Sequence, residues 1–303
     1  MWPLYLLFNK LLKTDEENVH QSVGDHLTVV EAFPFEQSVN NEKGNDATLP
    51  HSHFVEVPLI NQEHAWDCGL ACILMVLRTL GINSSNIQEL EKLSCTTSIW
   101  TVDLAYLLHK FSVSFSYFTV TVGANPNFSM ETFYKEQLPN DLMRVDMLFH
   151  KARDAGINIL VQFPHLRLVG NKFSFSFIQF RSISGEEISL FILSGKYIAI
   201  ALVDHYKLSQ SWVEDFCVSG FYSGSSGYTG HYIVICGYDA VTDEFEIRDP
   251  ASSRKHDKVT SKRLEEARKS FGTDEDLLLI SLERGINQNI PPVHLSSQNT
   301  INT

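Results

Sequence analysis

The chain has 303 residues, of which 44% are hydrophobic and 20% are charged, a composition typical of a globular protein. A net charge of −12, with no stripe rich in lysine or arginine, argues against nucleic acid as a partner. The five cysteines form no C-x-x-C pair, so neither a disulfide framework nor a zinc knuckle is expected, and free thiols fit a reducing compartment such as the cytoplasm. The apolar start of the chain is too short to span a bilayer and lacks the features of a signal peptide, so no transmembrane segment is predicted.

The sequence predicts one folded domain, over residues 51–284, between two polar ends. Residues 1–50 are mostly a polar, acidic lead-in that we expect to be disordered, and residues 285–303 form an Asn-, Gln- and Ser-rich tail of the same kind. Apolar segments are nearly continuous from Val55 to Leu282, which favours one domain over two.

The apolar spacing predicts helices in the first half of the domain and strands in the second. In chain order we expect a strand at 54–60, helices at 68–80, 85–93 and 101–111, a strand at 114–122, a mostly helical stretch at 130–156, strands at 197–203, 231–238 and 244–249, a helix at 262–270 and a strand at 277–282. This order is typical of an α+β fold, here a helix bundle packed on an antiparallel sheet with a cleft between them.

A candidate nucleophile stands at the start of the first long helix. Cys68 begins an apolar helical pattern, and a thiol at the positive end of a helix dipole is more readily ionised. Gln62 lies six residues earlier, where its side-chain amide and the Cys68 backbone N–H can both donate to an oxyanion. The alternative is that Cys68 is a buried small hydrophobe, the commonest fate of a free cysteine.

A base and its orienting acid are expected in the second half of the domain. His231 begins a strand after a glycine-rich loop, and Asp249 follows a hairpin that returns the chain beside it. A cysteine nucleophile needs a histidine to take its proton and an acceptor to orient that histidine. The alternatives are a satisfied core histidine and an aspartate that caps the turn before Pro250.

Three short blocks resemble the C39-like branch of papain-type cysteine peptidases. They are Gln62-x5-Cys68-Gly69-x-Ala71, Gly230-His231-Tyr232 with its apolar strand, and Arg248-Asp249-Pro250-Ala251. The resemblance implies a papain-like fold and a hydrolase that needs no cofactor, with Cys68, His231 and Asp249 as catalytic residues, Gln62 in the oxyanion hole and a peptide as substrate.

A longer resemblance covers nearly all of residues 1–285 and is to the plant soluble guanylyl cyclase 1 family. It is carried by the start Met1-Trp2-Pro3-Leu4-Tyr5 and by the blocks at residues 65–72, 98–108, 123–127, 228–232 and 271–277. The family name implies conversion of GTP to cyclic GMP and pyrophosphate, with Mg²⁺ or Mn²⁺. Residues 161–179 are extra relative to that pattern.

For a cyclase, the residues give only weak signals. The chain has no Walker A motif, so backbone N–H groups at Gly69, Gly227 and Gly230 are the expected phosphate donors. The acidic run Asp274-Glu275-Asp276 can hold a metal, although such a run is usually a solvated turn, and the metal ligands stay unknown. Three hypotheses therefore stay open: a cyclase, a cysteine hydrolase, and a non-catalytic peptide- or protein-binding module.

Overall fold

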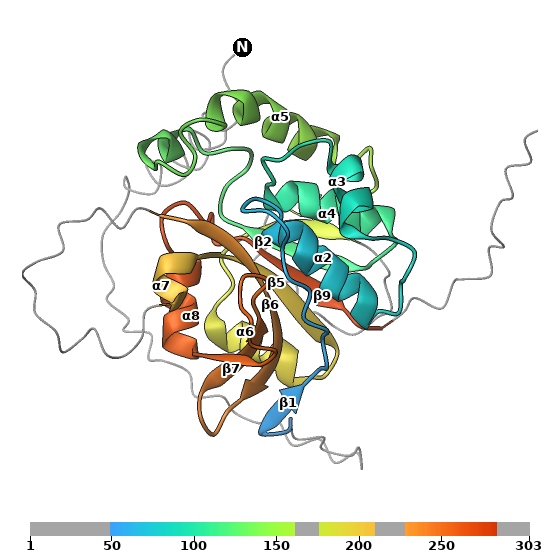
Figure 1. Cartoon of the computed structure of the whole chain (residues 1–303), viewed down its shortest axis with the longest axis vertical. Coiled ribbons are helices and arrows are strands. Elements are labelled where there is room, and N and C mark those ends of the chain that lie inside the picture. Colours follow the sequence, from blue (N-terminus) through green and yellow to red (C-terminus); the bar gives the residue numbers. More distant parts are fainter. Residues whose placement is uncertain (1–48, 161–175, 210–227, 284–303) are drawn as a thin grey trace, which may run out of the picture. The chain divides into compact units, whose positions relative to one another are not determined.

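The computed structural model describes residues 49–160, 176–209 and 228–283 (Figure 1). Its helices are α2 (Cys68–Thr79), α3 (Ile87–Ser94), α4 (Thr101–Lys110), η1 (Pro126–Met130), α5 (Leu138–Lys151), α6 (Gly185–Leu193), α7 (His205–Ser209) and α8 (Ser261–Arg268). Its strands are β1 (Ser52–Phe54), β2 (Phe115–Thr119), β3 (Asn158–Leu160), β4 (Phe177–Phe180), β5 (Tyr197–Asp204), β6 (Gly230–Asp239), β7 (Glu244–Arg248), β8 (Asp257–Thr260) and β9 (Leu277–Ser281). Within these ranges, none of the helices has the length and apolar character needed to cross a membrane. The two ends expected to be disordered lie almost wholly outside the described residues.

One sheet joins the described strands in the order β3-β4-β2-β9-β5-β6-β7-β8, with β1 paired to β6. The pairs from β2 through β9 to β8 are antiparallel, as predicted, but β4 runs parallel to both β2 and β3. The prediction of a purely antiparallel sheet is therefore wrong at this edge, and the sheet is mixed. The chain crosses over through α5 after β2, and such a crossover is what allows the next strands to pair in parallel.

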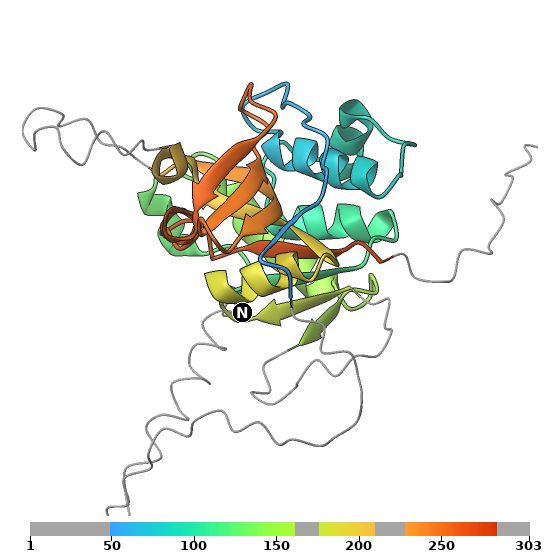
Figure 2. The same ribbon diagram turned by 90° about the horizontal axis from the view of Figure 1, so that it is seen from below.

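Helices cover both faces of the sheet. Alternate residues of β5 point to opposite sides: Ile198, Ile200 and Leu202 belong to the core cluster that contains α2, α4 and α5, whereas Ala199, Ala201 and Val203 belong to a second core with α6 and α8. Figures 1 and 2 show α2–α5 on one side of the sheet and α6 on the other. The α+β class is confirmed, with the sheet between two helical layers.

Two local predictions have different outcomes. The predicted helix at 68–80 is confirmed as α2, whose residues from Cys68 to Leu77 are all buried. The predicted strand at 54–60 is wrong beyond Phe54. β1 ends there, since after the bond from the Val55 N–H to the Cys236 carbonyl the chain leaves the edge of β6 and Pro58 offers no N–H to continue the ladder.

Candidate active site

Cys68 is the first residue of α2 and is only 6% exposed. The loop before it is held by the fully buried carboxylate of Asp67, which accepts hydrogen bonds from the backbone N–H groups of Glu63 (3.2 Å) and His64 (3.0 Å). The first backbone N–H groups of a helix have no partner within the helix and carry its positive dipole end. The thiol therefore lies where a developing negative charge is stabilised.

Pairing between β5 and β6 places two histidines side by side. Val203 pairs with His231 and Asp204 with Gly230, so His205 follows β5 at the point where β6 begins. The backbone N–H of His205 donates to the Thr229 carbonyl at 2.9 Å, which fixes this junction. The two imidazole rings are 4.4 Å apart between centroids.

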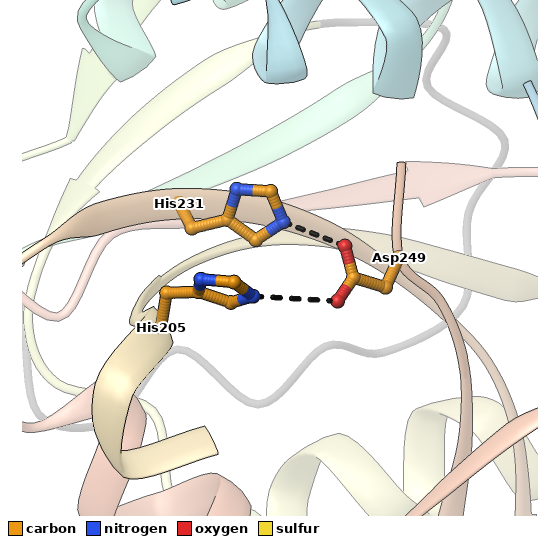
Figure 3. A group of neighbouring side chains, drawn as sticks. All are labelled: His205, His231 and Asp249. Carbon is orange, nitrogen blue, oxygen red and sulfur yellow. Dashed lines mark hydrogen bonds and ion pairs between the residues drawn. The ribbon is translucent and has the colours of Figure 1, made fainter. Parts of the chain in front are cut away.

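The hairpin of β6 and β7 brings Asp249 to the same place. Asp249 directly follows Arg248, which pairs with Val234 near the start of β6. Its Oδ1 accepts a hydrogen bond from His231 Nε2 at 2.7 Å, and its Oδ2 lies 3.7 Å from His205 Nε2 (Figure 3). The Ala251 N–H also donates to Oδ1 at 2.8 Å, so the carboxylate is fixed from three directions.

The environment of His231 favours its charged form. Burial lowers the pKa of this imidazole, but the hydrogen bond to Asp249 and the interaction with Cys68 outweigh that effect and raise the pKa to about 9. For Asp249, burial raises the pKa, whereas contacts with His205 and His231 lower it, and the result lies well below the usual range. Near neutral pH the pair is therefore an imidazolium and a carboxylate.

The two nitrogens of His231 have different partners. Nε2 is occupied by Asp249, and Nδ1 faces away from that carboxylate (Figure 3). Nδ1 is therefore the nitrogen that Asp249 leaves available for the interaction between the imidazole and Cys68. The structure thus brings together the three residues that the sequence predicted as nucleophile, base and orienting acid, although their catalytic roles stay predictions.

Gln62 lies in the loop before α2, where its backbone N–H donates to the Pro250 carbonyl at 3.0 Å. This bond ties the loop to the turn that follows Asp249. The side-chain Nε2 donates to the His64 carbonyl at 2.8 Å, so one of its two hydrogens is already engaged. The other hydrogen is the one that an oxyanion would need, and this role stays a prediction.

The glycines predicted to bind phosphate have different surroundings. A Cβ on Gly69 would lie 3.0 Å from Tyr232 Cδ2 and 3.1 Å from Leu104 Cδ1, so close packing by itself accounts for a glycine there. A Cβ on Gly230 would lie 2.8 Å from the Tyr228 hydroxyl. Gly227 lies outside the described residues. Phosphate binding at these positions stays a prediction.

The interpretation of residues 274–276 as a solvated acidic turn is wrong for Asp276, which is 4% exposed. Asp276 Oδ2 accepts from the Tyr117 hydroxyl at 2.9 Å, and its Oδ1 has no hydrogen-bond partner. Burial and the nearby Asp274 raise the pKa of Asp276 well above its ordinary value. The Glu275 carboxylate instead accepts from the Ser182 hydroxyl, so the three acids do not converge on one metal site.

His205 is the site residue that sequence reasoning missed. The signal was the pair Asp204-His205 at the end of a buried strand, but only the register between β5 and β6 places it beside His231. Together with His231 and Asp249 it forms a group whose ligand atoms all lie within 4.8 Å of one another, the one such group of three among the residues described. Mg²⁺ and Mn²⁺ prefer oxygen ligands, so two imidazoles and one carboxylate do not fit the metal that a cyclase implies.

Comparisons with known proteins place the chain in a family. The sequence profile of the family described as guanylylate cyclase matches residues 57–167 and 174–280. The chain is 56% identical over 291 residues to "Guanylyl cyclase 1" of Arabidopsis thaliana, which covers 95% of this chain and 99% of that protein.

Two solved structures are more distant. One is titled as a C39-like peptidase from Bacillus anthracis, with 13% identity and a TM-score of 0.35 over 77% of this chain and 98% of that chain. The other is xylellain, a cysteine protease from Xylella fastidiosa, with 12% identity and a TM-score of 0.40 over 80% of this chain and 90% of that chain.

Proposed function

This chain belongs to the guanylylate cyclase family, and we propose that it is an enzyme whose catalytic centre is built from Cys68, His231 and Asp249. The reaction that this geometry supports best is thiol-dependent hydrolysis of an acyl compound such as a peptide or an ester. The observation that carries the proposal is the 2.7 Å hydrogen bond between His231 Nε2 and Asp249 Oδ1, together with the interactions with Asp249 and Cys68 that raise the pKa of His231.

In this reaction the Cys68 thiolate attacks the acyl carbon of the substrate. The backbone N–H of Cys68, and the free hydrogen on Gln62 Nε2, are the candidate donors to the oxyanion that forms. The imidazolium of His231 then gives its Nδ1 proton to the leaving group, and the thioester that remains is hydrolysed by water, which returns the proton to His231. Asp249 keeps the imidazole oriented throughout and compensates its charge.

A second candidate activity is the conversion of GTP to cyclic GMP and pyrophosphate. It is favoured by the near full-length match to a protein named Guanylyl cyclase 1. The ribose 3′-hydroxyl would be the nucleophile, so the thiol would have no covalent role. The N-terminus of α2 at Cys68 and Gly69 is the candidate donor of backbone N–H groups to the phosphates.

One experiment separates the two activities. Purified full-length wild type and Cys68→Ala are each offered a panel of fluorogenic peptide amides and esters, and separately GTP with Mn²⁺ while cyclic GMP is quantified. Cys95→Ala is the matched control, since Cys95 is an exposed thiol outside the site. We expect hydrolysis by wild type and Cys95→Ala and none by Cys68→Ala.

Three results would change the proposal. Cyclic GMP formed equally by wild type and Cys68→Ala, with no hydrolysis by either, would replace the thiol reaction with cyclisation. Hydrolysis that survives in Cys68→Ala would remove the nucleophile. Neither activity in any variant would favour the non-catalytic binding module.

The free thiols also favour a cytoplasmic location for the protein, which microscopy of a tagged chain would test.

A further inference from the structure

We infer that His205, His231 and Asp249 form a binding site for a zinc-like transition metal ion at the edge of the catalytic centre. Nothing about the proposed hydrolysis needs such an ion, and the oxygen-preferring metals implied by a cyclase do not suit it. The inference starts from His205, which supplies a third ligand atom beside the His231–Asp249 pair.

The geometry is close to what zinc requires. The ligand atoms are His205 Nε2, His231 Nε2 and the carboxylate oxygens of Asp249, all within 4.8 Å of one another. Zinc–nitrogen and zinc–oxygen bonds of about 2.1 Å with tetrahedral angles separate ligand atoms by roughly 3.4 Å. The observed separations are 2.7 Å for His231 to Oδ1 and 3.7 Å for His205 to Oδ2, which lie on either side of that value.

The donor set is selective in its chemistry. Two imidazoles and one carboxylate are the protein ligands of many zinc sites that leave a fourth position open, whereas Mg²⁺ and Ca²⁺ need oxygen ligands. An ion can reach the group because the His205 side chain is 36% exposed, while those of His231 and Asp249 are 6% and 13% exposed. The site is thus closed on the protein side and open at His205.

The Cys68 thiol is not one of the ligand atoms of this group. Because the metal would occupy Nε2, Nδ1 would keep its proton and be available for the outer hydrogen bond that is usual for a metal-bound histidine. A metal-bound imidazole of this kind can no longer take up a second proton. Where the proposed function holds, a metal bound between His231 Nε2 and Asp249 is expected to inhibit hydrolysis, because it replaces the hydrogen bond that orients the imidazole.

The test measures Zn²⁺ binding directly, without any substrate. Full-length wild type, His205→Gln, Cys68→Ala and the control His150→Gln, which replaces an exposed histidine, are titrated with Zn²⁺ against a chromophoric chelator at neutral pH. Circular dichroism checks that each variant is folded. We expect wild type, His150→Gln and Cys68→Ala to bind with the same affinity, and His205→Gln to bind at least about tenfold more weakly because one of three protein ligands is gone.

Substitution with Co²⁺ tests the ligand set by its spectrum. Nitrogen and oxygen ligands predict no thiolate-to-cobalt charge-transfer band in wild type. An affinity of His205→Gln equal to wild type, loss of binding in Cys68→Ala, or a strong charge-transfer band would each overturn the inference. Zinc binding with this pattern but no hydrolysis of any substrate would instead leave the metal site standing and count against the proposed function alone.

Discussion

Replacing Asp249 with asparagine is the most informative single change in the site, because it removes a charge and keeps the shape. Asp249 is the first of the partners that raise the pKa of His231, ahead of Cys68, and it lies at 2.7 Å. An asparagine oxygen can still accept from His231 Nε2 but carries no charge. The variant therefore tests the electrostatic part of the interaction alone.

The magnitude follows from the pKa of His231. A rise from 6.5 to about 9 corresponds to about 3 kcal/mol in favour of the imidazolium, after burial has opposed it. An opposite charge at this range accounts for one to three pH units of such a rise, so we expect the pKa of His231 to fall by at least about 1 in Asp249→Asn.

The same interaction makes stability depend on pH. The His231 pKa is raised above its unfolded value, so its contribution to the free energy of unfolding is complete below about pH 6.5 and is lost as the pH rises through about 9. The loss of stability in Asp249→Asn that comes from this pairing should therefore be largest near pH 6 and shrink toward pH 10.

The assay is an NMR titration of the His231 Cε1–H resonance, which is assigned by its disappearance in His231→Gln. Asp154→Asn, which removes an exposed carboxylate, is the control and should leave the titration unchanged. If His231 in Asp249→Asn titrates within about 0.3 of the wild-type pKa, the carboxylate does not hold the imidazolium and the reasoning fails.

Three further predictions concern the residues around the site. Gly69→Ala should lower the free energy of unfolding in urea by about 1 kcal/mol, because the new Cβ would press on the buried ring of Tyr232. The Tyr232 hydroxyl is bonded to Thr101 at 2.9 Å, which holds the ring in place. Equal or higher stability would show that the ring can move. The stability of Asp276→Asn relative to wild type should increase as the pH rises from 5 to 9, because wild type has a buried carboxyl group with a raised pKa and loses stability as the pH rises. Melting temperatures of the two proteins that change in parallel with pH would contradict this. Any cyclic GMP formation should survive Cys68→Ala at least in part, since the ribose hydroxyl is the nucleophile in that reaction, and complete loss in a folded variant would refute this division of roles.

The sequence predicted those parts of the site that depend on local pattern. The start of α2 at Cys68 follows from apolar spacing that the structure confirms, and the hairpin between β6 and β7 follows from two apolar runs joined by a short polar turn. His205 could not be found this way, because its place beside His231 depends on the register between two strands that are separated by more than twenty residues of chain. Pairing between distant strands has no local signal.

The sequence also failed to predict which polar side chains are buried. Asp276 is buried because β9 runs through the centre of the sheet between β2 and β5, and the Tyr117 hydroxyl on β2 supplies its hydrogen bond. Composition alone favours a solvated turn for three consecutive acidic residues. The parallel edge of the sheet was also missed. Residues 161–179 were interpreted as extra relative to the family pattern and no strand was predicted there, whereas Phe177–Phe180 pairs with β2.

The central claim is that Cys68 is a nucleophile activated by His231, and the rate of its alkylation tests this most directly. Wild type and His231→Gln are treated with iodoacetamide at pH 6, and modification of each cysteine is followed by peptide mass spectrometry. Cys95, which is exposed and outside the site, is the internal reference. We expect Cys68 to react faster than Cys95 in wild type, although it is buried, and to slow by at least about tenfold in His231→Gln, because a neighbouring imidazolium stabilises a thiolate. A Cys68 that reacts more slowly than Cys95, at a rate that His231→Gln leaves unchanged, would contradict the account.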